Sequence, residues 1–393
     1  MRICCIADGR YVHSHRWLRF FTARGHKVHF LSFAPMQPHH VDIIERAGGV
    51  YEGEIGPFHI KRFWRTCRDW FRLRRLLRRE CIDIIQCHFL GANAWYAALS
   101  GFRPIALSVM GGGDVCGPSW RPKGIRERLL TPLALRRADL VTSWSMQMAK
   151  VVQRYCRSDV LVQVVNGGVD LQHFYPGPRS GRLLNHLRIP PDAKVILSPR
   201  LMRPLSNLDT IASAFHTVAG AEPDAYCLFV FPPEPKVEEY EKRVRGLAAS
   251  GPGAERVRFV GAVPHQEMAD YFRLANVMVS IPNTDGTPLS VLEAMACGTP
   301  VVVGNLPDYD TDYIEPEITV LPARFDDPAA VAHAILRVLR ESDTTRDRVT
   351  EARQRVERRG GYDMQMAQLE NLYMGVVSPA AKMQGAKPAA YQC

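Results

Sequence analysis

Short apolar runs alternate with longer amphipathic stretches along most of the chain, and this alternation predicts a series of β-α-β units. In the first half, strands are expected at 2–7, 28–33, 82–87, 105–109, 140–143 and 160–165. After a segment rich in proline and glycine, a second series of strands is expected at 195–198, 226–231, 257–260, 277–281, 300–303 and 318–321. Strands that alternate with helices in this way favour parallel sheets covered by helices on both faces.

Two such series fit two domains, because 393 residues are too many for one compact core. We expect a first α/β domain over 1–180 and a second over 181–343. The charged stretch 344–376 is predicted to be a helix that crosses back to the first domain, and 377–393 a disordered tail. In open parallel sheets, ligands bind beyond the carboxyl ends of the strands, so two facing sheets predict a site in the cleft between them.

Composition excludes several classes of protein. Apolar residues make up 46% of the chain and charged residues 23%, values close to those of globular proteins. The longest apolar runs, such as 227–231, are far shorter than the roughly 18 residues of a membrane span. The N-terminus reaches Asp8 before a segment typical of signal peptides forms. We therefore expect a cytoplasmic protein, and the scattered cysteines predict no metal site.

The stretch 283–300 is chemically the most informative part of the sequence. It follows an expected strand, and Thr287 as N-cap with Pro288 in the first turn predicts a helix over 288–297. Free N–H groups at the start of such a helix bind phosphate well. The residues expected to hold a diphosphate there are Gly286, Thr287, Pro288 and Leu289.

Two carboxylates accompany this helix. Glu293 lies one to two turns into it, where its two oxygens suit the two hydroxyls of a ribose. Asp285 lies on the preceding loop, closer to the expected position of a transferred sugar. The alternative, a capped amphipathic helix without a ligand, explains the apolar residues of this stretch but not Asp285 and Glu293.

An acidic residue, seven further residues and then glutamate within LEAMACGTPVV resemble the donor-binding signature of family 4 glycosyltransferases. The resemblance extends over nearly the whole chain, and it includes RGHKV at 24–28, DIIQCHF at 83–89, ADLV at 138–141 and NGGVD at 166–170. It implies the GT-B fold, which consists of two Rossmann-like, doubly wound parallel-sheet domains that face a central cleft. It also implies a nucleoside diphosphate sugar as donor substrate and retaining transfer that needs no metal and no other cofactor.

The same resemblance assigns a role to an arginine after the first strand of the second domain. Arg200 matches the family's arginine that contacts the donor phosphates; the alternative is a solvated surface arginine. The family's usual lysine, about five residues later, is missing. Arg203 is expected to replace its charge but not its geometry, because guanidinium and ammonium groups differ in shape.

A second departure from the family pattern lies in the first domain. The segment SVMGGGDV at 108–115 resembles a loop that often carries a histidine, but Met110 or Gly111 occupies that position. Gly112 and Gly113 still allow a close approach to the donor. His88, at the end of a strand, is the alternative cleft histidine, so the candidate catalytic residues are Asp285, Arg200 and His88.

The stretch 61–79 is both basic and amphipathic. Its basic side chains recur at spacings of three and four, at Lys61, Arg65, Arg68, Arg72, Arg75 and Arg79. The aromatic and aliphatic side chains fall mainly on the opposite side, which we expect to pack on the domain's own sheet. The net charge of +10 and the basic stripe predict docking to anionic lipid headgroups, and no recognised nucleic-acid module accompanies them.

These patterns favour an enzyme that transfers a sugar from its nucleotide donor to a lipid-linked or polysaccharide acceptor in cell-surface glycan biosynthesis. Its expected place is the inner face of the cell membrane. One alternative is a sugar-nucleotide epimerase, which shares the two-domain architecture. Another is a non-catalytic glycosyltransferase-like binding protein, because the usual lysine and histidine are missing.

Overall fold

The computed structural model describes residues 1–56, 63–110, 115, 120–160, 162–231, 237–307 and 309–378. The chain divides into two compact units. The first contains Met1–Gly167 together with Met364–Cys393, and the second contains Gly168–Asp363. The sequence places the boundary slightly later, after residue 180. Among the described residues, no helix is both long enough and apolar enough to cross a bilayer.

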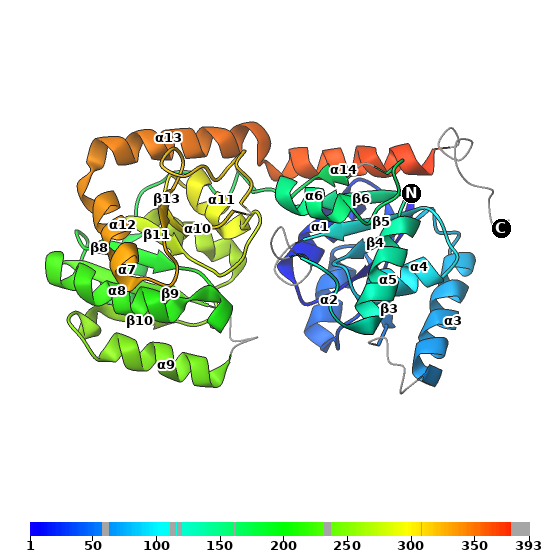
Figure 1. The fold of residues 1–393 in the computed structure, drawn as a ribbon, viewed down its shortest axis with the longest axis horizontal. Coiled ribbons are helices and arrows are strands. Elements are labelled where there is room, and N and C mark those ends of the chain that lie inside the picture. The colour runs from blue at the N-terminus through cyan, green and yellow to red at the C-terminus, as the bar shows by residue number, and fades with distance from the viewer. Residues whose placement is uncertain are drawn as a thin grey trace. The chain divides into compact units, whose positions relative to one another are not determined.

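The first unit is built on a parallel sheet of seven strands in the order β3-β2-β1-β4-β5-β6-β7 (Figure 1). Its strands are β1 (Arg2–Ala7), β2 (Lys27–Ser32), β3 (Val50–Glu54), β4 (Ile84–His88), β5 (Ile105–Val109), β6 (Leu140–Ser143) and β7 (Val162–Val164). Its helices are α1 (Val12–Ala23), α2 (Pro38–Arg46), α3 (Phe63–Arg79), α4 (Ala92–Leu99), α5 (Gly124–Arg137), α6 (Met146–Gln153) and α14 (Tyr362–Val377).

Helices cover both faces of this sheet, as its apolar central strands require. Helices α3, α4, α5 and α6 share one core cluster with the sheet. Helices α1 and α14 also pack together, where the ring of Phe21 stacks on that of Tyr373 with centroids 5.2 Å apart. Edge strand β3 is absent from the predicted set, because its sequence VYEGE is too polar to read as a buried strand.

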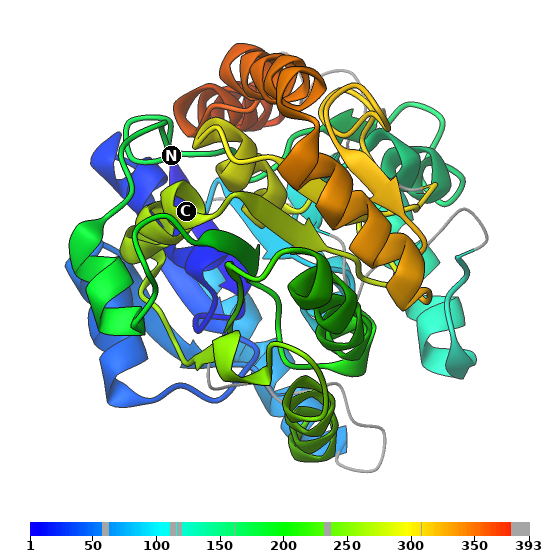
Figure 2. The same ribbon diagram turned by 90° about the vertical axis from the view of Figure 1, so that its left-hand side faces the viewer.

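The second unit has a parallel sheet of six strands in the order β10-β9-β8-β11-β12-β13 (Figures 1 and 2). Its strands are β8 (Lys194–Ser198), β9 (Ala225–Val230), β10 (Val257–Val260), β11 (Val277–Ser280), β12 (Val301–Gly304) and β13 (Leu321–Ala323). Its helices are α7 (Gly181–Leu187), α8 (Leu208–Ala221), α9 (Glu238–Ala249), α10 (Met268–Leu274), α11 (Leu289–Ala296), α12 (Pro328–Arg340) and α13 (Ser342–Arg359). Three short 3₁₀ helices are η1 (Pro204–Ser206), η2 (Ala254–Arg256) and η3 (His265–Glu267).

The stretch predicted as one helix from 344 to 376 contains two helices, α13 and α14. They are separated at Gly360 and Gly361, where the backbone pairs with Val169: the Val169 N–H donates to Gly360 O at 2.7 Å. Helix α13 packs on α11 in the second unit, whereas α14 packs on the first unit. Val377 ends α14, and the rest of the predicted tail, from 379 onward, lies outside the described residues.

Candidate donor-binding site

The order of the second sheet defines where a ligand is expected. Strands β8 and β11 are neighbours, and the chain leaves them toward opposite edges of the sheet. Loops diverge at such a topological switch point and leave a crevice beyond the carboxyl ends of the strands. The loops 199–207 and 281–288, which follow β8 and β11, therefore form the candidate site.

Hydrogen bonds tie these two loops together. The Asn283 N–H donates to Leu205 O at 2.9 Å, and Asn207 Nδ2 donates to Ile281 O at 2.8 Å. Asn207 has a φ of 50°, in the left-handed region that asparagine tolerates better than most residues. The sequence therefore specifies a loop pair that is held in place before any ligand binds.

Each loop contributes one charged side chain to an ion pair. Arg200 Nη2 lies 2.9 Å from Asp285 Oδ2, and the two side chains are only 18% and 17% exposed. The other carboxylate oxygen of Asp285 accepts a hydrogen bond from the Gly286 N–H at 2.9 Å. The structure thus brings together the arginine and the aspartate that the sequence analysis selected from segments more than eighty residues apart.

Helix α11 begins one residue later than predicted. Pro288 is its N-cap residue, without a side-chain hydrogen bond, so the assignment of Thr287 as N-cap was wrong. Proline fits here because it has no N–H that a helix start would leave without a partner. Gly286, Thr287, Pro288 and Leu289 are all buried, and the N–H groups of the first turn of α11 follow directly after Asp285.

Glu293 lies in the second turn of α11 and has a partner that the sequence did not suggest. His265 Nε2, on η3, lies 2.8 Å from Glu293 Oε1, and Glu293 is 5% exposed. The His265 ring also packs 5.3 Å from the ring of Phe174. One carboxylate oxygen of Glu293 is thus held by the histidine, which leaves the second for a ligand. A lone histidine outside any motif gave no signal in the sequence.

Buried hydroxyl groups gather at the same edge of the sheet. Ser198 ends β8 and Ser280 ends β11, and both are fully buried, with side-chain oxygens that have no hydrogen-bond partner among the described residues. The hydroxyl of Tyr309, just after β12, is also buried without a partner. Burial, and then the nearby charge of Asp285, raise the pKa of Tyr309, so it remains a neutral donor. Buried polar groups without partners are rare and call for a ligand or an ordered water.

The other predicted donor contacts are less well defined. Arg203 is half-buried and precedes η1, in the loop that also carries Arg200. Gly112 and Gly113 lie outside the described residues. The predicted contact of these two glycines with the donor therefore stays a prediction.

His88 lies in the first unit, at the carboxyl end of β4, next to that sheet's own switch point between β1 and β4. It is 2% exposed, its Nδ1 has no hydrogen-bond partner among the described residues, and its ring packs edge-on against Trp17 at 5.6 Å. Burial lowers the pKa of His88 to about 4, so the imidazole is neutral at physiological pH. It can exchange hydrogen bonds with a hydroxyl group but does not supply a positive charge.

The chain has two doubly wound parallel sheets. An arginine, two carboxylates and the start of a helix lie at the switch point of the second sheet. This combination of fold and site defines the GT-B class of glycosyltransferases. Family models agree with this class. The model described as Glycosyltransferase Family 4 matches residues 9–173, and the model described as Glycosyl transferases group 1 matches residues 182–355. Together the two models match most of the chain, and they support a GT-B glycosyltransferase of the family 4 type.

Individual proteins show how far the similarity extends. D-inositol 3-phosphate glycosyltransferase from Streptomyces bingchenggensis is 27% identical over 244 residues, which cover 57% of this chain and 52% of that protein. The chain thus matches about half the length of this curated relative.

Solved structures extend the likeness of fold over the whole chain. A glycosyltransferase from Rickettsia africae has a TM-score of 0.79 at 14% identity, with coverage of 96% of this chain and 99% of that one. HepE from Anabaena, in complex with UDP, has a TM-score of 0.78 at 16% identity, with coverage of 95% and 100%. These structures confirm the predicted GT-B fold.

Proposed function

We propose that the chain is a retaining glycosyltransferase that moves a sugar from a nucleoside diphosphate sugar to a lipid-linked or polysaccharide acceptor in cell-surface glycan biosynthesis. The observation that carries the proposal is the Arg200–Asp285 pair, which lies directly before the start of α11 at the switch point of the second sheet. The UDP bound to Anabaena HepE supports a nucleotide donor. Matches to two glycosyltransferase models support transfer over epimerisation.

The chemistry follows from where charge develops during transfer. The bond between the anomeric carbon and the diphosphate oxygen breaks, a bond to an acceptor hydroxyl oxygen forms with the same configuration, and the proton of that hydroxyl passes to the departing diphosphate. Negative charge grows on the departing diphosphate, so cations and amide dipoles fixed beside it stabilise the transition state more than the bound donor. Arg200 and the first N–H groups of α11 supply these in our proposal, with Arg203 as a second cation, and no metal ion takes part.

The two carboxylates have separate roles. Asp285 holds Arg200 in place before the donor binds, and it turns to a sugar hydroxyl when the diphosphate replaces it beside the guanidinium. Glu293 accepts hydrogen bonds from the ribose, and His265 keeps its carboxylate oriented. His88 is proposed to contact a sugar or acceptor hydroxyl as a neutral imidazole, in line with its lowered pKa.

The test is consumption of nucleotide sugars by the purified chain, with and without a membrane lipid extract as the source of acceptor. The proposal expects release of one nucleoside diphosphate that depends on the extract, together with a radiolabelled, sugar-bearing product. An epimerase would convert the donor to a second nucleotide sugar without the extract. Binding of donors without consumption of any would contradict the proposal and favour a non-catalytic protein.

A further inference from the structure

The most exposed large apolar side chains of the described residues are confined to two helices of the first unit. They are Trp64, Ile125, Leu129, Phe71 and Phe63, with exposures of 84%, 78%, 66%, 64% and 62%. Three of them belong to α3 and two to α5. Single exposed apolar residues are ordinary, but a concentration of this kind marks a surface that meets an apolar partner.

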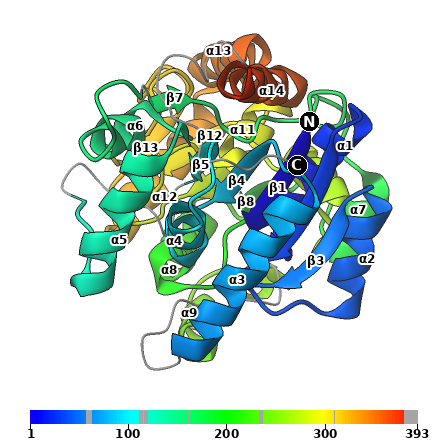
Figure 3. The ribbon, with the colours of Figure 1, turned by 90° about the vertical axis from the view of Figure 1, so that its right-hand side faces the viewer.

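Both helices lie on the same face of the first sheet, with α4 between them (Figure 3). Trp70 Nε1 on α3 donates to Leu99 O at the end of α4 at 2.8 Å. Trp95 Nε1 on α4 donates to Thr131 Oγ1 on α5 at 3.2 Å. The exposed side chains of α3 and α5 therefore belong to one layer of the unit.

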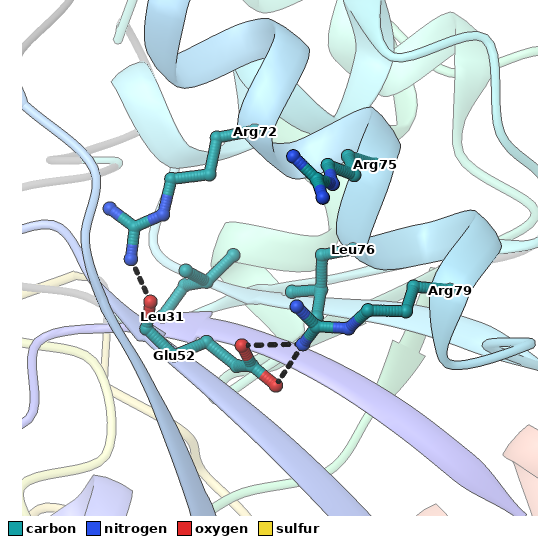
Figure 4. Close-up of a pocket in the computed structure, with 6 residues that line it drawn as sticks. All are labelled: Leu31, Glu52, Arg72, Arg75, Leu76 and Arg79. Carbon is teal, nitrogen blue, oxygen red and sulfur yellow. Dashed lines mark hydrogen bonds and ion pairs between the residues drawn. The ribbon is translucent and has the colours of Figure 1, made fainter.

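The orientation of α3 about its axis is fixed by arginines that bind back to the sheet. Arg72 donates to Glu54 O at 3.0 Å and also to Glu52 O, and Arg79 contacts the Glu52 carboxylate at 3.0 Å. Figure 4 shows the contacts of the two arginines with Glu52. These arginines line a pocket of about 330 Å³ between α3 and the edge of the sheet. Two members of the predicted arginine stripe, Arg72 and Arg79, thus bind to their own unit.

The expectation that the aromatic and aliphatic side of α3 faces its own sheet is correct for Trp70 and Leu77, which pack on the core cluster, but not for the other aromatic residues. The buried positions are Leu73, Leu76 and Leu77 together with Thr66 and Asp69. Phe63, Trp64 and Phe71 are exposed. With about 3.6 residues per turn, Trp64 and Phe71 lie close to the basic stripe around the helix, and Phe63 is the first residue of the helix. Lys61, the first member of the stripe, lies outside the described residues.

The charge around the exposed apolar groups is mainly positive, although Glu127 on α5 is exposed between Ile125 and Leu129 and its carboxylate accepts the Lys123 N–H at 2.7 Å. Helix α3 contains seven arginines and one aspartate. Arg65 and Arg75 are exposed and have no ion-pair or hydrogen-bond partner among the described residues. Arg128 on α5 and Arg121 and Lys123 just before it are exposed beside Ile125 and Leu129. Apolar groups surrounded by a net positive charge fit the boundary of an anionic bilayer, where apolar acyl chains lie beneath anionic headgroups.

We propose that α3 and α5 together form a docking surface for an anionic lipid bilayer. Phe63, Trp64, Phe71, Ile125 and Leu129 enter the region between headgroups and acyl chains, and the free arginines contact the headgroup phosphates. In β-α units a helix runs against its strands, so both helices begin on the carboxyl side of the sheet, where ligands bind. The surface therefore places that side of the first unit close to the membrane. This inference rests on the two helices and not on the transfer reaction.

The test is co-sedimentation of the full chain with vesicles of phosphatidylcholine alone or mixed with phosphatidylglycerol. We expect binding only to the anionic vesicles. The variants Phe63→Gln/Trp64→Gln and Ile125→Gln/Leu129→Gln should each weaken it by roughly tenfold or more, because each loses two inserted apolar groups. These side chains are solvent-exposed, and unchanged thermal unfolding and unchanged nucleotide binding will confirm that the variants are folded.

A charge-matched pair of variants separates docking from simple net charge. Arg65→Glu/Arg75→Glu should abolish binding to the anionic vesicles. The control, Arg346→Glu/Arg358→Glu on α13, changes the total charge by the same amount. It should retain most of the binding, because both control arginines are exposed in the other unit. Equal losses in the two double variants would overturn the proposal. Binding of the α3 and α5 variants at the wild-type level would also overturn it. The same holds if the wild-type protein does not bind vesicles but self-associates, and these variants abolish the self-association.

Discussion

At the scale of single residues, each carboxylate of the proposed donor site is held by a partner side chain. Arg200 pairs with Asp285, and Glu293 pairs with His265. We predict that Glu293→Ala weakens binding of the nucleoside diphosphate by about tenfold to a hundredfold, because a buried hydrogen-bonded carboxylate is lost. Isothermal titration with the preferred nucleotide measures this. Glu267→Ala, on the exposed end of η3, is the control and should bind like the wild type.

Arg200→Ala is expected to behave differently from Glu293→Ala. In our proposal Arg200 faces charge that grows during bond breaking, so its loss should lower kcat by about a hundredfold or more while KM changes little. Steady-state kinetics with the donor that the chain consumes will separate the two effects. Arg200→Lys should recover part of the rate, since it restores a charge without the planar guanidinium. A rise in KM with kcat unchanged would remove Arg200 from the transition state.

Asp310 lies in the loop after β12 and is only 4% exposed. Burial raises the pKa of Asp310 from 3.8 to about 6. The folded state therefore binds this proton more tightly than the unfolded state, and the ionised group reduces stability at neutral pH. The destabilisation caused by the ionised Asp310 carboxylate disappears as pH falls from about 6 to about 4.

Asp310→Asn should accordingly raise the free energy of unfolding by roughly 2 kcal/mol at pH 7.5 and by much less at pH 4.5. The amide oxygen can still accept the Asp312 N–H bond, which is 3.1 Å long in the native protein. Urea denaturation at the two pH values measures the difference. A variant that is less stable than wild type at pH 7.5 would show that the carboxylate is stabilising there.

At the scale of elements, α14 is held to the first sheet by a buried hydrogen bond between the Tyr373 hydroxyl and Gln86 Oε1. Tyr373→Phe leaves the amide oxygen without this partner, so we predict a loss of about 1–3 kcal/mol in the free energy of unfolding. Tyr175→Phe is the matched control, because Tyr175 is 51% exposed. Chemical denaturation of both variants is the measurement, and equal stability of the two would mean that the bond contributes nothing.

Elements also show what the sequence can predict. The central strands of both sheets follow from their apolar runs, such as VVV in β12, because buried parallel strands are apolar on both faces. The polar edge strand β3 and the break at Gly360 could not be recognised in this way. The orientation of α3 about its axis could not be predicted either, because it depends on contacts of Arg72 and Arg79 with a strand that is distant in the sequence.

The residues of the candidate site also divide into those that the sequence predicts and those that it does not. Asp285, Glu293 and the start of α11 lie in one motif and are visible in the sequence. Arg200 required the family resemblance. His265 and Tyr309 could not be found, because only folding brings a lone histidine and a lone tyrosine next to the motif.

At the scale of the whole molecule, we propose different tasks for the two units. In this proposal the second unit binds the donor at the switch point of its sheet, and the first unit carries His88 and the membrane-docking surface. Binding to the native state alone also stabilises a protein, so the matching nucleoside diphosphate should raise the melting temperature. A panel of nucleoside diphosphates in a thermal-shift assay identifies the base. No shift with any of them would contradict a donor site.

Hydrogen–deuterium exchange with and without that nucleoside diphosphate tests the central claim most directly, because it locates the bound ligand along the chain. We predict slower exchange in the loops 199–207 and 281–288 and in the first turn of α11, with the strands of the first unit unchanged. Protection confined to the first unit, with these loops exchanging as in the free protein, would contradict a donor site at β8 and β11.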